Sequence, residues 1–222
     1  VNSGNGNPVY YNAGGQLVQR NIQTGGYHFA NSMSDPTLGA ATSLTTADKK
    51  ILGSAQPTDF GAFTNTFSYK GFELDIMFRY QTGNKIMNIT RQEVLLNQRF
   101  ANSGTEILNR WTTPGQITDV PKIWYAQDAV VNQNLEAISR FVEDGSFLRL
   151  QNIVMSYTID SKKLKDISNN AIKSARFFIQ AQNVHVWTKH RGIDPEAYSE
   201  DGQDNNISPQ VRNMSIGVTL GL

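Results

Sequence analysis

The sequence predicts an all-β fold dominated by a long antiparallel sheet, and three observations support this prediction. Apolar and polar residues alternate over several stretches of nine or more residues, which is the period of a strand with one apolar face. No run of ~18 apolar residues, as a transmembrane helix requires, occurs in the 222 residues. Short turns alternate with long connections along the chain, an asymmetry typical of outer-membrane barrels.

The first 59 residues show no sustained period. They are rich in Gly, Asn, Ser and Thr and contain turn pairs such as Gly14-Gly15 and Gly25-Gly26. We expect this region to be irregular, with short strands at most.

The clearest hairpin begins at Phe60. Phe63, Phe67 and Tyr69 share one phase, Lys70-Gly71 breaks the pattern, and a second stretch alternates strictly from Phe72 to Tyr80. These two stretches predict neighbouring antiparallel strands.

Three further strands are predicted later in the chain. They cover Ser146 to Ile159, Ser174 to Thr188 and Val211 to Leu222. In the first of them the apolar phase slips between Leu150 and Ile153, which predicts a β-bulge.

Two long connections separate these strands, at about 82–143 and 189–210. Within the first, Thr90 followed by Glu93 fits a capping box and predicts a short helix. Connections of this length are uncommon in compact soluble domains unless they are functional.

Periodicity leaves two interpretations of the sheet open. In a soluble sandwich the apolar faces point into a core, whereas in a membrane barrel they point to lipid and the polar faces line the lumen. Aromatic residues near the strand ends favour the membrane, although any sheet is rich in aromatics. About five strands cannot close a barrel that needs ~8, so the chain would form only part of one.

In the barrel interpretation, each strand side chain has an expected environment. The lipid-facing or girdle side chains are Phe63, Phe67, Tyr69, Phe72, Phe78, Tyr80, Phe177 and Trp187. The lumen-facing side chains are Glu73, Asp75, Arg79, Arg176, Gln180 and Gln182.

Composition excludes several kinds of chemistry. The net charge of +1 provides no basic surface for nucleic acid. The absence of cysteine excludes disulfides, thiolate zinc sites and a cysteine nucleophile. Polarity resides in 21 Asn and 15 Gln rather than in charge, since only 18% of residues are charged.

Candidate ligand residues lie mainly in the connections. Trp111, Trp124 and Tyr125 could stack on a ligand or contact a covering partner, with plain loop packing as the alternative. Asp194 and Glu196 flank Pro195, which favours a loop-shaping role over glycoside hydrolysis.

No metal or cofactor is predicted. The acidic run Ser199–Asn206 resembles a calcium loop but lacks EF-hand spacing. His28, His185 and His190 share no zinc spacing, and no nucleophile motif for hydrolysis occurs, so we do not expect an enzyme.

Several ordered motifs resemble the C-terminal end of the SusC/RagA-like family of TonB-dependent outer-membrane transporters from Bacteroidetes. The most specific block is Ser139–Ile153, with sequence SRFVEDGSFLRLQNI. The others are Asp48–Pro57, Phe63–Leu74, Gly83–Asn88, Arg110–Gly115, Thr118–Pro121, Gln182–Val184, Trp187-Thr188 and Gly192–Glu196. One departure is the final residue, Leu222, where the family usually has an aromatic residue read during barrel assembly.

The resemblance implies the C-terminal strands of a large antiparallel transmembrane β-barrel, incomplete on its own, in the Gram-negative outer membrane. Residues 1–59 would be an extracellular loop region and 60–222 barrel strands with long extracellular loops. The implied function is import of oligosaccharides or peptides, with a SusD-like surface lipoprotein as partner. TonB would act through N-terminal parts that have no counterpart in the sequence, which starts at Val1. The alternative is a secreted soluble β-sandwich that binds carbohydrate.

Overall fold

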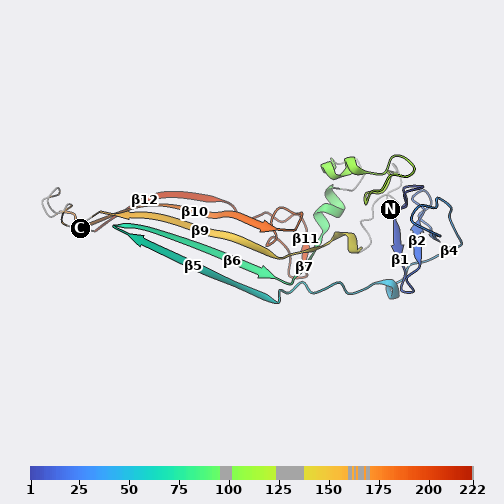
Figure 1. Cartoon of the computed structure of the whole chain (residues 1–222), viewed down its shortest axis with the longest axis horizontal. Helices are drawn as coiled ribbons and strands as arrows, with labels where there is room; N and C mark the ends of the chain where they lie inside the picture. Colours follow the sequence, from blue (N-terminus) through green and yellow to red (C-terminus); the bar gives the residue numbers. More distant parts are fainter. Residues whose placement is uncertain are drawn as a thin grey trace. The chain divides into compact units, whose positions relative to one another are not determined.

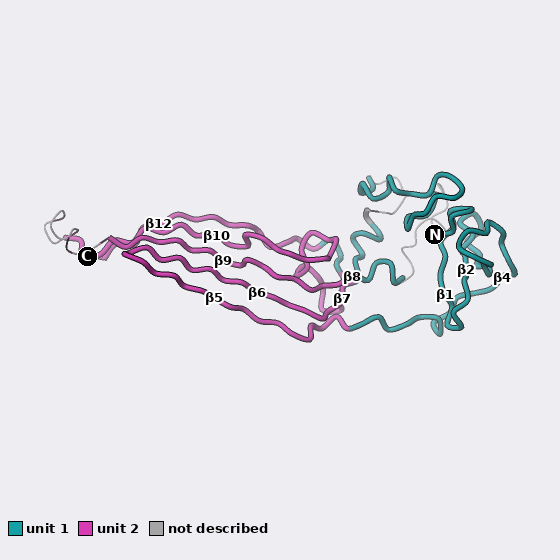
Figure 2. Tube along the Cα trace, in the orientation of Figure 1, with its two compact units in different colours: residues 1–53, 87–142, 204–206 teal, residues 54–86, 143–203, 207–222 magenta. Residues whose placement is uncertain are grey.

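The computed structural model describes residues 1–95, 102–123, 138–159, 162, 164, 168 and 171–221. Contacts divide the chain into two compact units, shown in different colours in Figure 2. Unit 1 comprises residues 1–53, 87–142 and 204–206. Unit 2 comprises residues 54–86, 143–203 and 207–222. The predicted regions, residues 1–59 and 60–222, are two continuous segments, whereas each unit contains several segments; the predicted boundary at residue 59 stays a prediction.

Unit 2 is built on a five-stranded antiparallel sheet, with its strands side by side in Figure 1. Its order is β12-β10-β9-β6-β5, so strands that follow one another in this series along the chain are also neighbours in the sheet. The strands are β5 (Asp59–Tyr69), β6 (Phe72–Thr82), β9 (Phe147–Thr158), β10 (Ser174–Thr188) and β12 (Asn213–Gly221). All five predicted strands are confirmed.

The β5–β6 hairpin has a continuous register from Asp59 opposite Thr82 to Tyr69 opposite Phe72. Lys70 and Gly71 form its two-residue turn, with φ of 46° and 88°. Two consecutive positive φ values are those of a type I′ turn, whose twist matches that of the flanking strands. The turn therefore fixes the register that places alternate residues on opposite faces.

The predicted bulge in β9 is confirmed. Across from β6, Met77 pairs with Asn152 but Phe78 pairs with Leu150, so β9 carries one extra residue there. The register with β10 shifts at the same level, where Asn183 has φ of 53°. Gln151 Nε2 donates to Asn183 Oδ1 at 2.8 Å, and Asn183 Nδ2 donates to the carbonyl of Val211 at 2.8 Å. The shift preserves the apolar phase on both sides of the bulge.

Unit 1 contains a small four-stranded sheet in the order β1-β2-β3-β4. Its strands are only two to four residues long: β1 (Val9–Tyr11), β2 (Leu17–Arg20), β3 (Tyr27–Phe29) and β4 (Ala41–Thr42). Fully buried Gln19 accepts from Asn5 Nδ2 at 2.9 Å and donates to the carbonyl of Thr37 at 2.6 Å. Amide side chains thus hold together loops that lack long strands.

The remaining described elements are short. The 3-10 segments are η1 (Thr46–Asp48), η3 (Thr105–Asn109) and η5 (Ser139–Phe141), and η2 (Thr90–Leu95) is π-helical. A three-stranded sheet has the order β11-β7-β8, with β7 (Lys85–Asn88), β8 (Val142–Asp144) and β11 (Gln203–Asp204). Among the described residues, no helix has both the length and the apolar character needed to cross a membrane.

The helix predicted at residue 90 is confirmed as η2, but the predicted capping arrangement is wrong. Arg91 N donates to Asn88 Oδ1 at 2.8 Å, so Asn88 supplies the cap. The Thr90 hydroxyl instead donates to Asp204 Oδ1 at 2.9 Å and accepts from Asn206 N at 2.6 Å. Asp204 and Asn206, more than a hundred residues away in the sequence, thus engage the Thr90 hydroxyl that a capping box would use.

Candidate functional site

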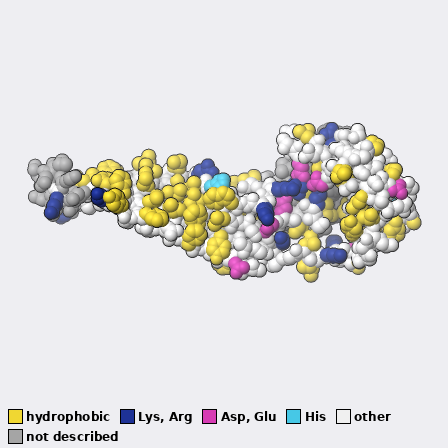
Figure 3. Space-filling model, in the orientation of Figure 1, with side chains coloured by type: hydrophobic (Ala, Val, Ile, Leu, Met, Phe, Trp, Pro, Cys, Tyr) yellow, Lys and Arg dark blue, Asp and Glu magenta, His cyan; other side chains and the backbone are white. Residues whose placement is uncertain are grey.

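One face of the five-stranded sheet is apolar and exposed. Because residues directly opposite one another share a face, the register joins Phe63 to Phe78, Phe72 to Tyr157 and Ile179 to Ile216 on this side. Phe67 is 59% exposed and Ile216 81% exposed. Figure 3 shows apolar side chains gathered over these strands. An apolar patch of this continuity marks a surface that contacts lipid or protein.

All eight side chains predicted to face lipid lie on this apolar face. Phe78 is half-buried and the other seven are exposed. Ring contacts run across the strands, with centroids 5.0 Å apart for Phe63 and Phe78 and 4.5 Å apart for Phe72 and Tyr157. Their common orientation is a structural fact, while contact with lipid stays a prediction.

The opposite face is polar, and it carries all six side chains predicted for the lumen. Arg176 Nη2 lies 2.6 Å from Glu73 Oε1, and its Nε donates to Ser156 Oγ at 3.0 Å. Thr66 Oγ1 donates to Asp75 Oδ1 at 2.5 Å, and Gln180 Nε2 donates to Asn152 Oδ1 at 3.0 Å. Gln182 lies opposite Asn152 and Asn213. This face presents hydroxyl and amide groups together with paired charges.

Arg79 and Arg149 belong to a four-charge cluster near one end of the polar face. Arg149 Nη2 contacts Asp194 Oδ1, and Arg149 Nε lies 2.6 Å from Glu196 Oε2. The other oxygen of Glu196 lies 2.8 Å from Arg79 Nη2. The Arg149 and Asp194 side chains are each 4% exposed. Asp194 and Glu196, predicted as ligand contacts or loop-shaping residues, are engaged here with strand arginines.

Arg149 was missed as a site residue by sequence reasoning. Its position in the polar phase of β9 was readable, but the carboxylates that it binds lie 45 or more residues away. In the structure the Arg149 guanidinium lies 5.6 Å from the ring centre of buried Phe147, a contact that the sequence pattern does not show.

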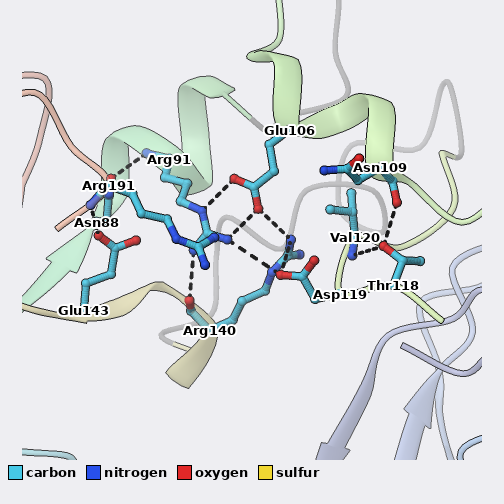
Figure 4. Close-up of polar contacts among 10 residues, drawn as sticks. All are labelled: Asn88, Arg91, Glu106, Asn109, Thr118, Asp119, Val120, Arg140, Glu143 and Arg191. Atoms are coloured by element: carbon cyan, nitrogen blue, oxygen red, sulfur yellow. Dashed lines mark hydrogen bonds and ion pairs between the residues drawn. The ribbon is translucent and has the colours of Figure 1, made fainter. Parts of the chain in front are cut away.

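Unit 1 has its own ionic network, shown in Figure 4. Buried Arg91 donates to both oxygens of Glu106, at 2.8 and 2.5 Å, and to the carbonyl of Arg140 at 3.1 Å. The Arg91 guanidinium also lies 5.3 Å from the centre of the Phe141 ring. Phe141 and Val120 form the apolar core beneath. This network ties η2 to η3 and η5.

Trp111 lies in unit 1 and is half-buried. Its Nε1 donates to the carbonyl of Ser3 at 2.9 Å, and the ammonium of Lys122 lies 5.9 Å from the ring centre. A Cβ at Gly6 would lie 2.6 Å from this ring, so the indole packs on bare backbone. Trp124 and Tyr125 lie outside the described residues.

Asp144 and Lys122 have shifted pKa values. Hydrogen bonds from Ser146, chiefly from its hydroxyl, lower the pKa of Asp144, and burial lowers the pKa of Lys122. Within the described parts of the chain, no three His, Asp or Glu side chains come together as metal ligands would.

Comparisons with known proteins identify homologues. No family model matches the chain. It is 31% identical over 187 residues to TonB-dependent receptor P3 of Formosa agariphila, covering 80% of the chain and 18% of that protein. It is 26% identical over 186 residues to TonB-dependent receptor P26 of the same organism, covering 80% of the chain and 18% of that protein. The chain spans about a fifth of the length of these relatives.

Solved structures match as well. The chain is similar to the structure of the RagAB peptide transporter with a TM-score of 0.72 and 27% identity, covering 99% of the chain and 22% of that chain. The "closed-closed" state of the RagAB peptide importer matches with a TM-score of 0.66 and 28% identity, over 90% of the chain and 22% of that chain.

These matches confirm the resemblance predicted from the motifs, the all-β fold and the predicted location, since TonB-dependent receptors are outer-membrane proteins. Over most of its length, the chain is homologous to TonB-dependent receptors of Formosa agariphila and similar in structure to part of the RagAB peptide transporter.

Proposed function

We propose that the chain forms part of the wall and the extracellular loops of a TonB-dependent transporter that imports oligosaccharides or peptides. Unit 2 supplies the wall, with its apolar face toward lipid and its polar face toward the lumen. A SusD-like surface lipoprotein captures the solute, and TonB acts through other parts of the transporter. The chain itself carries out no covalent chemistry.

The two-faced sheet is the observation that carries this proposal. A soluble sandwich would cover its apolar face, yet Phe67, Tyr69 and Ile216 are each more than half exposed. On the other face, charges are paired and hydroxyl and amide groups dominate. A lipid-facing band beside a hydrated lumen accounts for both faces.

The dimensions of the apolar face fit a bilayer. Phe72 and Tyr80 lie at the levels of Phe177 and Trp187 and are eight residues apart along β6, which has no extra residue, so they span ~27 Å at ~3.4 Å per residue. A strand tilt of ~40° reduces this to a band about 21 Å tall, close to the ~25 Å of the apolar band of outer-membrane barrels. Aromatic side chains at both ends of the band fit the interfacial girdles.

The loops of unit 1 are suited to contact with the lipoprotein or the solute. Trp111 is held by Ser3 and Gly6 in a defined orientation, and in this proposal it contacts the covering partner together with Trp124 and Tyr125. The name RagAB peptide transporter supports a peptide as solute of that similar protein, and the polar face described here is compatible with either solute class.

Detergent dependence tests the proposal on the complete protein that contains this chain. We expect it to fractionate with outer membranes, to require detergent for a monodisperse state, and to change its mobility in SDS gels on boiling. A protein that stays monodisperse without detergent and shows no change in mobility contradicts the proposal and favours the soluble β-sandwich.

A further inference from the structure

The long connection between β10 and β12 returns to the sheet at the four-charge cluster of Arg79, Arg149, Asp194 and Glu196. Arg79 and Arg149 lie directly opposite one another on β6 and β9. Like charges at such positions destabilise a strand pair. Because the Glu196 carboxylate forms ion pairs with both guanidinium groups, at 2.8 and 2.6 Å, the connection supplies the negative charge that the two strands lack.

The local conformation of the connection aims both carboxylates at these arginines. Asp194 occupies the first position and Pro195 the second position of a turn closed by Ala197 N donating to the Asp194 carbonyl at 3.1 Å. Asp194 Oδ1 also accepts from Glu196 N at 3.0 Å. Pro195 is fully buried, and its ring restricts φ. The turn can therefore adopt few other backbone conformations, even without the ion pairs.

Both limbs of the connection are held. At its start, Glu143 Oε2 accepts from Arg191 N at 2.8 Å and lies 2.9 Å from His190 Nδ1. Before β12, Gln210 N donates to Asp194 Oδ2 at 3.3 Å. In the middle, Gln81 Nε2 donates to the Tyr198 hydroxyl at 3.1 Å. The Asp194 carboxylate therefore holds the two ends of the connection together, and both carboxylates hold the connection to the sheet.

We propose that Arg149 is a positioning residue whose double ion pair latches residues 192–198, and Gln210 through Asp194, onto the polar face of the sheet. The latch explains why Phe147 and Arg149 are buried on a face whose other members are largely exposed or half-buried. A burial of this kind is stable only while every charge is paired, because an unpaired buried charge loses its hydration without gaining a partner. The connection is thus a fixed part of the wall, and on the proposed function it narrows the polar passage at this end.

Hydrogen–deuterium exchange of the complete protein in detergent tests the latch. The amides of Glu196, Ala197 and Gln210 all donate to Asp194, which the ion pair with Arg149 holds in place. In Arg149→Met we expect exchange of peptides covering 192–198 and 210 to accelerate at least tenfold, while those from β5 and β6 stay unchanged. Arg149→Lys, which keeps one charge but loses the two-sided guanidinium contact, should give an intermediate effect.

Arg176→Met is the matched control, since Arg176 also lies on the polar face and pairs with Glu73, but at half-exposed positions away from the connection. It should leave exchange at 192–198 unchanged. Unchanged exchange there in Arg149→Met overturns the latch, as does an equal acceleration throughout the sheet. Since the readout needs neither lipid nor solute, either result leaves the proposed transport function standing, and a failure of transport leaves the latch standing.

Discussion

Ala181 provides a sharp test of the lipid-facing assignment. It lies in β10 between Ile153 and Met214 on the apolar face and is half-buried. Its level in the sheet is midway between those of Phe177 and Trp187, the two ends of the band. An arginine at the middle of a lipid-facing band costs ~2–4 kcal/mol, whereas a substitution on an exposed soluble surface usually changes stability by about 0.5 kcal/mol or less.

We therefore expect Ala181→Arg to destabilise the complete protein in phospholipid vesicles by ~2–4 kcal/mol. Gln180→Arg, one residue along on the polar face, removes only the hydrogen bond to Asn152 and should cost ~1 kcal/mol. The assay is a urea titration in vesicles, with the folded fraction read from the mobility of unboiled samples. Equal urea midpoints for the two variants would refute the assignment of the faces.

Three further predictions concern the turn, the unit 1 network and pH. Gly71→Ala should destabilise the hairpin by ~1–3 kcal/mol in the same titration, because φ is 88° and its Cβ would lie 2.7 Å from the Thr158 carbonyl oxygen. Lys70→Gly should be neutral or stabilising. If Lys70→Gly destabilised the protein more than Gly71→Ala did, the assignment of the type I′ turn would be contradicted. Arg91→Met should cost ~3–5 kcal/mol locally and expose residues 87–95 and 102–123 to limited proteolysis. Asp119→Asn, at a 64% exposed side chain, should leave digestion unchanged, and equal digestion of both variants would argue against the network. Since the pKa of Asp144 is lowered, its stabilising effect is present above the ordinary aspartate pKa and is lost as pH falls through the lowered value. Ser146→Ala should move that loss to higher pH in thermal unfolding followed between pH 3 and 5, and an unchanged profile would show that the Ser146 hydroxyl does not lower the pKa of Asp144.

Strands and faces could be predicted because period-two patterning is local. The alternation from Phe72 to Tyr80 specifies which side chains share a face, and a phase slip at Leu150 reveals the bulge. The Lys70-Gly71 break marks the turn for the same reason. Wherever one residue's environment depends on its immediate neighbours, the sequence pattern was sufficient.

The ionic clusters could not be predicted because their members are distant in sequence. Arg91 pairs with Glu106 across a connection without periodicity, and Arg149 pairs with Asp194 across β10. A single buried arginine does not change the alternation of apolar and polar residues, so the sequence pattern does not indicate its partner. The capping motif at Thr90 failed for a related reason, since Asp204 and Asn206 engage its hydroxyl.

The most direct test of the central claim is the environment of alternate residues along β10. The chain has no cysteine, so a single cysteine introduced at Phe177, Ile179, Gln180 or Gln182 of the complete protein carries one nitroxide label, provided that its other segments are also free of cysteine. In bilayers, we predict that labels at 177 and 179 collide with lipid-dissolved oxygen and not with a water-soluble nickel chelate. Labels at 180 and 182 should be shielded from oxygen. Accessibility that does not alternate, or nickel collisions at 177 and 179, would contradict a wall with one lipid face and one lumen face.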